Sequence, residues 1–439
     1  MAKVNSLLAL LFFSLAALAQ DVRPLTILHS NDLHAHLLPD DQGMGGFAYL
    51  ATAVRQERAH SAASLYLNAG DLVQGTPVST LFQGLPIYEI ANHLGFDVST
   101  LGNHEFDYGW ERIEDFVKAA KFPIVSANVV GHGGGFLAGK PYVIKTVGGI
   151  RVAVIGVLLG DLVGNLATPE KVGPWHILPV VETVRKYAAE LRDKSDLIVV
   201  LGHIHDQEAD EILQQVPEVS IAIVGHSHRE YAKLHNFDGR VGALVTSYGV
   251  ELGRLDLQVD ITAHKLKSAE WKIIPVDSKK LTPDPLVARE VAEWEAKVSK
   301  IVDVPIGEAK HRFEKRDLQI LIERAMADET GSDLAWINLG NVRDIIPAGT
   351  ILARTVWNIL PFDNAVVIGK FKGSQLPAKV REGHTIDPNR EYTLATTDFT
   401  AANQASADQL GVSGFDFPKT AAMQRDMVID WIKKKKILE

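Results

Sequence analysis

The sequence contains no cysteine, and this absence limits the chemistry that the protein can use. Without a thiol there are no disulfide bonds, no thiolate metal ligands and no lipid-modified cysteine. A strong excess of one charge is also absent, since 45 lysines and arginines stand against 54 aspartates and glutamates, for a formal net charge of -9. This balance gives no electrostatic case for binding a nucleic-acid polymer. An anionic small molecule would need a local positive site, made by metal ions or by converging arginines.

Long apolar runs are missing after the N-terminus, so the sequence predicts no later membrane-spanning segment and no stable membrane anchor. The first residues combine Lys3, an apolar stretch over 7–15 and Ala17-Leu18-Ala19 before Gln20. This pattern predicts a signal peptide over residues 1–19 and an exported protein, periplasmic or extracellular. A short membrane anchor is the alternative, but the apolar stretch is shorter than the roughly 20 residues that a bilayer requires.

The chain of 439 residues is long enough for two or three domains, and its 46% hydrophobic and 23% charged residues are typical of folded soluble proteins. From Pro24 onward, short apolar runs alternate with amphipathic stretches, which is the pattern of strands and helices in layers. We expect strands at 25–28, 64–68, 98–100, 124–127, 151–157, 197–201, 221–224 and 244–247. We expect helices at 47–60, 79–94, 110–120, 180–194 and 206–215.

The pattern changes near Pro275, where the strand-like alternation ends. Pro283-Asp284-Pro285 then leads into a helical stretch over 286–302, and Pro305 follows it. Proline-rich turns around a single helix are typical of a junction between domains. The sequence therefore predicts a first domain over 20–275, a connector with a helix over 276–305, and a second α/β domain over 306–439.

Polar motifs follow predicted strands at five places in the first domain, and each contains a metal ligand of the hard or borderline type. They are Asp32-Leu33-His34, Gly70-Asp71, Gly102-Asn103-His104-Glu105, Gly202-His203 and Gly225-His226-Ser227-His228. Ligands of α/β sheets collect at the carboxyl ends of strands. A glycine precedes four of the five motifs, and we expect it to allow a sharp turn there. Each motif by itself is most simply a turn, but five together predict a metal site.

The stretch Gly102-Asn103-His104-Glu105-Phe106-Asp107, together with the other motifs, resembles the calcineurin-like metallophosphoesterases, and specifically the secreted bacterial-type 5'-nucleotidases. The resemblance runs from about Thr26 to the end of the chain. It implies an α/β fold, with a four-layer α/β/β/α sandwich followed by a smaller α/β substrate-binding domain. It also implies a phosphohydrolase, with nucleoside monophosphates as the first expectation for the substrate.

The resemblance implies two divalent metal ions, drawn from Mn, Zn, Co, Fe or Mg. It assigns one ion to Asp32, His34 and His228, the other to Asn103, His203 and His226, and a bridging position to Asp71. Two neighbouring cations share a water, lower its pKa and hold the attacking and leaving oxygens of a displacement at phosphorus. The expected reaction is therefore attack on a phosphoester by a metal-bridging hydroxide.

His104 and Asp107 match the catalytic pair of the family. His104 is not needed as a metal ligand, so its ring can stabilise the phosphoryl group or protonate the leaving group. Asp107 would orient that ring and favour its charged form. We expect Glu105 to support the site rather than to take part in catalysis.

In the second domain, the segments 336–343 and 360–364 resemble the family's nucleotide-binding domain. The residues that match its substrate-contacting positions are Arg312, Asn338, Arg343, Phe362 and Phe399. Two parallel aromatic faces, Phe362 and Phe399, would hold a flat heterocycle between them. Without the resemblance, Phe362 after a proline is more simply a core residue.

The second domain also departs from the family pattern. The usual glycine-rich turn is altered at Leu339 and Asn341, and the acidic residue expected after Phe399 is replaced by Ala405 within 403–406. Loss of a hydrogen-bond acceptor of this kind changes substrate discrimination. The sequence therefore leaves open a 2',3'-cyclic-nucleotide phosphodiesterase, a nucleotide-sugar pyrophosphatase and a sulfate-ester or thiosulfonate-ester hydrolase. Outside the enzymes, the alternative is a metal-dependent nucleotide-binding protein without turnover.

Overall fold

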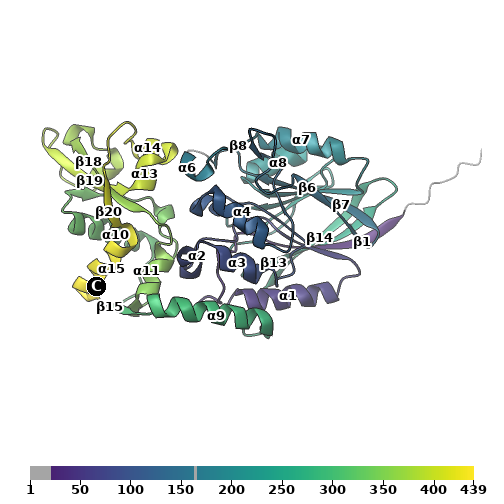
Figure 1. Cartoon of the computed structure of the whole chain (residues 1–439), viewed down its shortest axis with the longest axis horizontal. Helices are drawn as coiled ribbons and strands as arrows, with labels where there is room; N and C mark the ends of the chain where they lie inside the picture. The colour runs from purple at the N-terminus through teal and green to yellow at the C-terminus, as the bar shows by residue number, and fades with distance from the viewer. Residues whose placement is uncertain (1–20, 163–165) are drawn as a thin grey trace, which may run out of the picture.

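The computed structural model describes residues 21–162 and 166–439, so the predicted signal peptide, residues 1–19, lies outside the described residues. Figure 1 shows a larger body formed by the N-terminal part of the chain and a smaller body formed by the C-terminal part. Helix α9 (Pro285–Val302) runs along the lower side of both. Among the described residues, no helix combines the length and the apolar character needed to cross a bilayer.

The larger body is built on two six-stranded sheets. The first has the order β14-β13-β1-β2-β3-β4, with β1 Val22–Ser30, β2 Ser64–Asn68, β3 Val98–Thr100, β4 Ile124–Val125, β13 Glu251–Asp260 and β14 Lys265–Pro275. The second has the order β11-β12-β10-β9-β7-β6, with β6 Tyr142–Val147, β7 Ile150–Leu158, β9 Leu197–His203, β10 Ile221–Gly225, β11 His235–Phe237 and β12 Arg240–Ala243. The central strands of each sheet are parallel, and the antiparallel pairings lie toward the edges.

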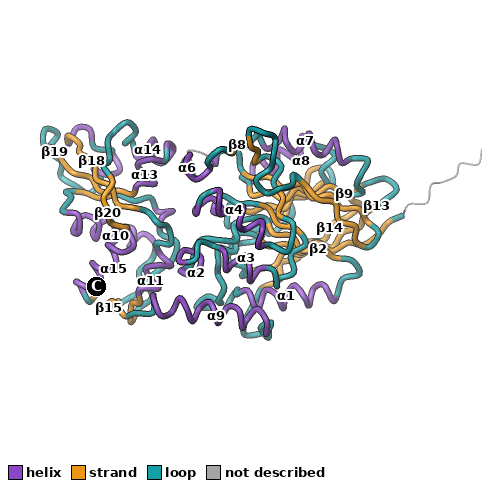
Figure 2. The backbone as a smooth tube through the Cα atoms, viewed as in Figure 1, coloured by secondary structure: helices purple, strands orange, loops and turns teal. Residues whose placement is uncertain are grey.

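Alternating side chains bury both faces of the central strands. On β7, Val152 and Val154 pack into the core between the sheets, whereas Ala153 and Ile155 pack into the core under the helices. This is the two-residue period of a strand that is covered on both sides. The helices lie outside the sheets in Figure 2, so the predicted α/β/β/α layering is confirmed. Those helices are α1 Phe47–Ala59, α3 Leu85–Ala91, α4 Trp110–Ala119, α7 Val180–Leu191 and α8 Asp206–Gln215.

Two expected elements differ from the structure. The helix expected over 79–94 is divided into α2 (Pro77–Leu81) and α3, because Gly84 takes a φ of 77° and Pro86 lies at the start of α3. The strand expected over 244–247 is a buried loop that continues past the end of β12. In this loop a side chain replaces the neighbouring strand as hydrogen-bond partner, since the Asn31 amide donates to the carbonyl of Val245 at 2.9 Å.

The smaller body has a three-stranded and a four-stranded sheet. The first has the order β17-β15-β21, with β15 Pro305–Ala309, β17 Gly349–Leu352 and β21 Ile437–Leu438. The second has the order β16-β19-β18-β20, with β16 Leu334–Ala335, β18 Ala365–Lys372, β19 Glu391–Thr397 and β20 Lys419–Met423. The main helices are α10 Lys315–Thr330, α11 Ala353–Ile359, α13 Asp398–Ala402, α14 Gln404–Leu410 and α15 Gln424–Lys435. Helices α10 and α15 pack on each other and supply the centre of a separate apolar core.

Helix α9 connects the two bodies through ion pairs as well as through the chain. Its N-terminus is capped by Asp284, whose carboxylate accepts hydrogen bonds from the N–H groups of Leu286 and Val287. Near its C-terminal end, Arg354 of α11 binds Glu295 at 2.7 Å and Asp303 at 2.6 Å. We propose that the chain consists of a first domain over 20–275, a connector over 276–305 that contains α9, and a second domain over 306–439.

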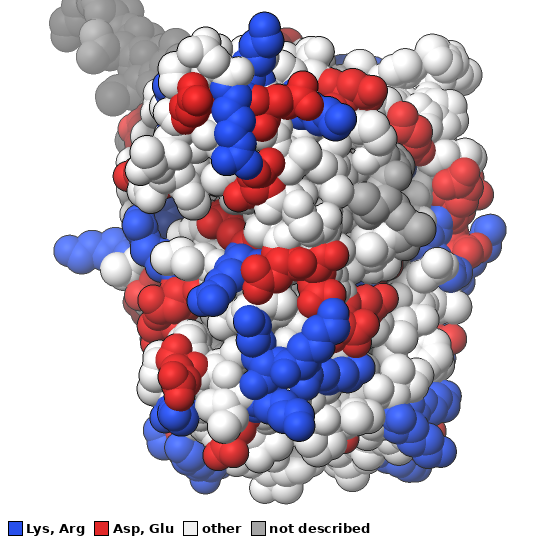
Figure 3. Space-filling view, turned by 90° about the vertical axis from the view of Figure 1, so that its left-hand side faces the viewer, with Lys and Arg blue, Asp and Glu red and all other residues white. Residues whose placement is uncertain are grey.

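Charges of both signs are mixed on the outer face of the smaller body. Figure 3 shows Lys and Arg side chains beside Asp and Glu over much of this face. Some of them form ion pairs, as between Lys434 of α15 and Glu329 of α10. This mixture agrees with the low net charge of the sequence.

Candidate metal and phosphoester site

The seven predicted metal ligands lie together at the carboxyl ends of strands. Six of them follow the strands β1, β2, β3 and β10 directly or within a few residues, and His203 is the last residue of β9. Since these strands are parallel within their sheets, their carboxyl ends meet at one edge of the sandwich. The set is Asp32, His34, Asp71, Asn103, His203, His226 and His228.

One half of the cluster consists of Asp32, His34, Asp71 and His228. Each offers one ligand atom, and these atoms all lie within 4.8 Å of one another. Nε2 of His34 and Nε2 of His228 are 3.0 Å apart. Nε2 of His228 is also 3.4 Å from Oδ1 of Asp32. The spacing is that of side chains arranged around one small cation.

The other half is arranged around the side-chain oxygen of Asn103. This oxygen is 3.0 Å from Nε2 of His203 and 3.0 Å from Nδ1 of His226. Nε2 of His203 is in turn 3.1 Å from Oδ2 of Asp71. Asp71 also lies 3.7 Å from Nε2 of His34, so its carboxylate borders both halves. A carboxylate has two oxygens and can serve two cations at once.

The chemistry of these donors fits divalent metal ions. Two carboxylates, one amide oxygen and four imidazoles converge, and Asp32, His34 and His203 are fully buried. Buried carboxylates are costly unless a positive charge is close. At the 3.0 Å contact between His34 and His228 two ring nitrogens meet, which requires either a shared proton or a cation. Oxygen and nitrogen donors without thiolate suit Mn, Zn, Fe, Co or Mg.

The electrostatics of the cluster favour positive charge beside its carboxylates. Burial acts to lower the pKa of His203, but the carboxylates of Asp71 and Asp32 raise it to about 10. Burial acts to raise the pKa of Asp71, but His203 and His104 hold it well below its usual range. The buried carboxylates thus favour positive charge beside them, which a divalent cation would also supply.

The backbone of the cluster is unusual. Positive φ angles occur at Asp32 (51°), His34 (45°), Asp71 (53°), His226 (89°) and His228 (55°). Non-glycine residues seldom adopt this conformation, and it concentrates at functional sites where the surrounding structure holds it in place. The turns that aim the side chains at one point are therefore made by the polar residues themselves.

The expected role of the preceding glycines needs correction. Only Gly70 has a positive φ, 85°, whereas Gly102, Gly202 and Gly225 do not. At Gly102 the requirement is space, because a Cβ there would lie 2.1 Å from Oδ1 of Asp71. A Cβ on Gly225 would lie 2.5 Å from the carbonyl oxygen of Ala69. These glycines let neighbouring strand ends approach closely, which the sequence does not reveal.

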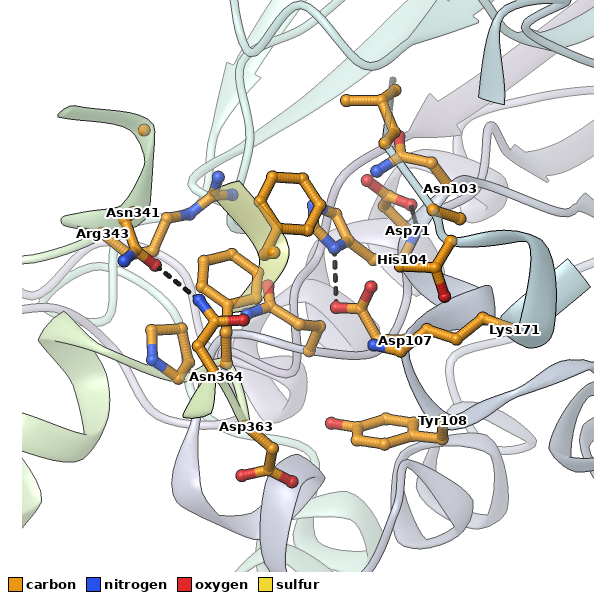
Figure 4. Close-up of a pocket in the computed structure, with 18 of the residues that line it drawn as sticks. Asp71, Asn103, His104, Asp107, Tyr108, Lys171, Asn341, Arg343, Asp363 and Asn364 are labelled. Carbon is orange, nitrogen blue, oxygen red and sulfur yellow. Dashed lines mark hydrogen bonds and ion pairs between the residues drawn. The ribbon is translucent and has the colours of Figure 1, made fainter. Parts of the chain in front are cut away.

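His104 and Asp107 form a pair in the short 3₁₀ helix His104–Tyr108. Nδ1 of His104 is 2.8 Å from Oδ2 of Asp107, and the backbone N–H of His104 donates to Oδ1 of Asp71 at 2.9 Å. Burial acts to lower the pKa of His104, but Asp107 and Asp71 outweigh it and raise the pKa. Figure 4 shows the pair at the wall of a cavity, beside Asp71 and Asn103.

Glu105 connects the loops that carry the ligands. Its carboxylate accepts hydrogen bonds from the N–H groups of Gly102 (2.6 Å), Leu72 (2.9 Å) and Asp71 (3.2 Å), and from the hydroxyl of Tyr88 (3.3 Å). Burial and Asp71 raise the pKa of Glu105 to about 7, against the effect of the backbone N–H groups. All its acceptor capacity is used inside the protein, as expected for a supporting residue.

A cavity of about 260 Å³ lies between the two bodies, next to the cluster. Its wall in the larger body includes Asp71, Asn103, His104, Asp107, Tyr108, Lys171, His226 and His228. Its wall in the smaller body includes Asn338, Asn341, Arg343, Phe362, Asp363, Asn364 and Phe399. Four of the five predicted substrate-binding residues are thus brought to the same space as the ligands.

The fifth, Arg312, lies elsewhere. Its exposed guanidinium is 2.7 Å from Glu314 and 3.9 Å from Asp41, and it lines a second cavity. Arg343 borders both cavities, and its guanidinium lies 5.7 Å from the centre of the Phe362 ring. In this arrangement of the two bodies, Arg343 and not Arg312 is near the cluster.

Sequence reasoning missed Asn364 and Lys171 and noticed Asn341 only as a departure from the family pattern. Asn364 lies two residues after Phe362, and its position on the same loop was the available signal. Lys171 belongs to the short helix Pro169–Val172 and carries no motif that would single it out. The segment with Ala405 does not line the cavity; there Asn403 caps α14 by accepting a hydrogen bond from the N–H of Ser406.

Comparisons with known proteins agree with these features. Residues 25–230 match the family described as calcineurin-like phosphoesterase, and residues 298–379 match the 5'-nucleotidase C-terminal domain. The protein UshA of Escherichia coli is 28% identical, over 86% of this chain and 85% of UshA. Endonuclease YhcR of Bacillus subtilis is 26% identical over 94% of this chain, which spans 40% of the length of YhcR.

Solved structures share the fold. A 5'-nucleotidase precursor from Thermus thermophilus superimposes with a TM-score of 0.85 and 23% identity, over 95% of this chain and 97% of that one. The sulfate thiohydrolase SoxB of the same organism gives a TM-score of 0.80 at 15% identity, over 94% of each chain. The similarity covers both bodies of the molecule. The chain therefore belongs to the calcineurin-like metallophosphoesterases that carry a 5'-nucleotidase C-terminal domain, and it is a metal-dependent phosphoester hydrolase.

Proposed function

We propose that the protein is a dinuclear-metal 5'-nucleotidase that releases phosphate from nucleoside monophosphates. The observation that carries the proposal is the position of two phenylalanines, Phe362 and Phe399, in the cavity that also contains the ligand cluster and His104. Aromatic faces are suited to a flat base, and the cluster is suited to a phosphoryl group. A nucleoside monophosphate has both parts.

The donors divide into two sets around Asp71. We assign Asp32, His34 and His228 to one metal ion and Asn103, His203 and His226 to the other, with Asp71 shared. Divalent ions bound there would supply Lewis acidity to the phosphoryl oxygens and lower the pKa of the water that attacks phosphorus.

The chain's own groups complete the reaction. His104 lines the cavity and its Nδ1 is engaged by Asp107, so Nε2 is the ring nitrogen left for a substrate. We assign to the protonated ring the role of donating a proton to the leaving ribose oxygen, which becomes the hydroxyl of the nucleoside. Asp107 keeps the ring oriented and charged. Arg343, at the junction of the two cavities, adds positive charge near the phosphoryl group.

We also infer that the protein is exported and cleaved near Gln20. The support is the N-terminal pattern of Lys3, an apolar stretch over 7–15 and the small residues before Gln20. Mass spectrometry of the protein isolated from the cell envelope fraction tests this inference. A mature N-terminus near Gln20 supports it, and an intact Met1 contradicts it.

Hydrolysis assays test the proposed activity. After chelation and reloading with Mn, Co, Zn or Mg, the mature protein is given nucleoside monophosphates, a 2',3'-cyclic nucleotide, a nucleotide sugar, a thiosulfonate and an aryl phosphate. We expect the highest kcat/KM for nucleoside monophosphates. A higher value for any other class overturns the assignment in favour of that class.

Variants locate the reaction. Asp71→Ala and His203→Ala are expected to lose bound metal, measured by elemental analysis, together with turnover. His60→Ala, an exposed histidine outside the cluster, is the matched control and should behave like the wild type. Full turnover in Asp71→Ala and His203→Ala would contradict the metal assignment.

A further inference from the structure

Three amide side chains form a relay from the core of the smaller body to the wall of the cavity. Nδ2 of Asn364 donates to Oδ1 of Asn341 at 3.1 Å, and Nδ2 of Asn341 donates to Oε1 of Gln424 at 3.0 Å. Gln424 is buried in the core, and its Nε2 faces the sulfur of Met326 at 3.4 Å. Figure 4 shows the contact between Asn341 and Asn364 at the cavity.

Hydrogen bonds from backbone N–H groups hold the residues of the relay in place. The N–H of Gln424 donates to the carbonyl oxygen of Asn364 at 2.9 Å, and the N–H of Asn341 donates to Oδ1 of Asn338 at 2.9 Å. These bonds fix where each side chain starts. The remaining freedom of the relay is the direction in which the three amides point.

The sulfur of Met326 decides that direction. A thioether accepts weakly and has no hydrogen to donate. If Gln424 were flipped, its oxygen would face this sulfur without a donor and would be left buried and unsatisfied. Gln424 therefore presents oxygen to Asn341, Asn341 presents oxygen to Asn364, and the Nδ2 of Asn364 is committed to the relay.

The consequence appears at the cavity. Oδ1 of Asn364 has no hydrogen-bond partner among the described residues, and Asn364 lines the cavity together with Phe362 and Phe399. The wall beside the two aromatic rings thus offers an acceptor of fixed direction. The only carboxylate of this loop, Asp363, is held instead by Arg425 at 2.7 Å.

We propose that Asn341 and Gln424 are positioning residues that fix Asn364 as a hydrogen-bond acceptor, so that the cavity selects planar bases with an N–H group on the edge facing it. The inference rests on the proposed nucleotidase function. It also gives a physical role to Asn341, which departs from the family's glycine-rich turn.

Pairs of substrates that differ by a single amino group test the proposal. AMP is compared with purine riboside 5'-monophosphate, and CMP with the 2-pyrimidinone riboside 5'-monophosphate, so that an N–H donor is removed without adding bulk. For the wild-type enzyme we expect kcat/KM to be about tenfold higher for the amino-bearing member of at least one pair. Equal values within both pairs would overturn the proposal and leave the nucleotidase function intact.

Two variants of Asn341 separate positioning from packing. Asn341→Gly removes the partner of Asn364, frees its amide to rotate, and should bring the ratio within the pair close to one. Asn341→Asp can still accept from Nδ2 of Asn364, so it should keep the wild-type ratio even if its overall rate falls. A ratio that survives in Asn341→Gly, or is lost in Asn341→Asp, contradicts the proposal.

A binding readout keeps the test valid if a variant turns over slowly. Adenosine and purine riboside are compared as competitive inhibitors of aryl phosphate hydrolysis, with the melting temperature as a check of folding. Adenosine should be favoured over purine riboside by a similar ratio of inhibition constants in wild type and in Asn341→Asp, and this ratio should approach one in Asn341→Gly. If wild type hydrolyses the aryl phosphate but no nucleotide, the proposed function itself fails and this inference fails with it.

Discussion

The ring of Phe362 lies 5.8 Å from the ring of His104, and the two planes are inclined by 29°. Phe362 belongs to the smaller body and His104 to the larger one, so the residue proposed to stack on the base and the residue proposed to protonate the leaving group share one cavity. The neighbouring residue Pro361 is held to the larger body through its carbonyl oxygen, which accepts a hydrogen bond from the hydroxyl of Thr80 at 3.0 Å. In the proposed function, substrate binding and chemistry therefore depend on the same arrangement of the two bodies.

Replacing His104 by Asn should lower kcat by about 10²–10⁴ while leaving metal content unchanged, because the proposed mechanism has the ring act on the leaving group and does not count it among the ligands. Asp107→Asn should lower kcat less, since the ring remains but loses its charged partner at 2.8 Å. Steady-state kinetics with elemental analysis on the same samples measure both. Loss of metal in His104→Asn would show that His104 is a metal ligand and would contradict its proposed role as proton donor.

Replacing Phe362 and Phe399 by Leu should raise KM for nucleoside monophosphates, because each aromatic face contributes about 1–3 kcal/mol of stacking with a base. We expect an increase of about fivefold to a hundredfold for each substitution. Glycerol phosphate, which has no ring, is the control substrate, and its kcat/KM should change little. An equal loss for both substrates would mean that the phenylalanines support the fold and not the base.

Replacing Gly102 by Ala should abolish metal binding and activity. The new Cβ would lie 2.1 Å from Oδ1 of Asp71, so the carboxylate assigned to both ions would have to move. Gly133→Ala is the matched control, because no atom lies within 4 Å of a Cβ there. Metal titration of the two variants by calorimetry gives the comparison, and normal affinity in Gly102→Ala would show that the strand ends can separate.

Replacing Glu105 by Gln should destabilise the protein and weaken metal binding together. The substitution turns one carboxylate oxygen into an NH₂ group, which cannot accept a hydrogen bond. At least one of the N–H groups of Gly102, Leu72 or Asp71 would then lose its acceptor. The expected cost is about 1–3 kcal/mol of the free energy of unfolding. Urea unfolding measures it, with the exposed Glu89→Gln as control. Unchanged stability with lost turnover would instead make Glu105 a catalytic residue.

The free energy of unfolding should fall as pH rises because of Glu323 in α10. Burial raises the pKa of this carboxyl to about 7, although the N–H of Ile337 and the amide of Gln319 oppose the rise. A folded pKa above the unfolded value of 4.5 gives a contribution that is complete below pH 4.5 and is lost as pH rises toward 7.

Glu323→Gln should remove this dependence while keeping an acceptor for Ile337. Between pH 5 and pH 8 the wild type should lose about 1–3 kcal/mol more than the variant, measured by urea unfolding at each pH. Parallel curves for the two proteins would show that Glu323 is ionised throughout this range.

The sequence alone predicted the layers and predicted that polar motifs gather after strands of the first domain. The layers follow from the period of the apolar residues, as on β7, where Val152 and Ala153 face opposite cores. The gathering of the polar motifs follows from their places after strands, because parallel strands bring their carboxyl ends to one edge whatever the exact packing. The assignment of individual ligands to metal ions rests on the family resemblance and stays a prediction. His34 and His228 are far apart in the chain, yet their ring nitrogens meet at 3.0 Å.

Features that depend on approach between distant segments were decided only by the tertiary structure. The turns at the cluster are made by positive φ angles of the ligands themselves, and Gly102 is required by close contacts with another segment. Neither feature can be predicted from the local sequence. Which of Arg312 and Arg343 lies near the cluster depends on how the two bodies sit together. The direction of the Asn364 amide depends on a sulfur in another helix, that of Met326. Sequence determines which groups are available, because side-chain chemistry and period are local properties; distances between segments are set by packing and are known only once the chain is folded.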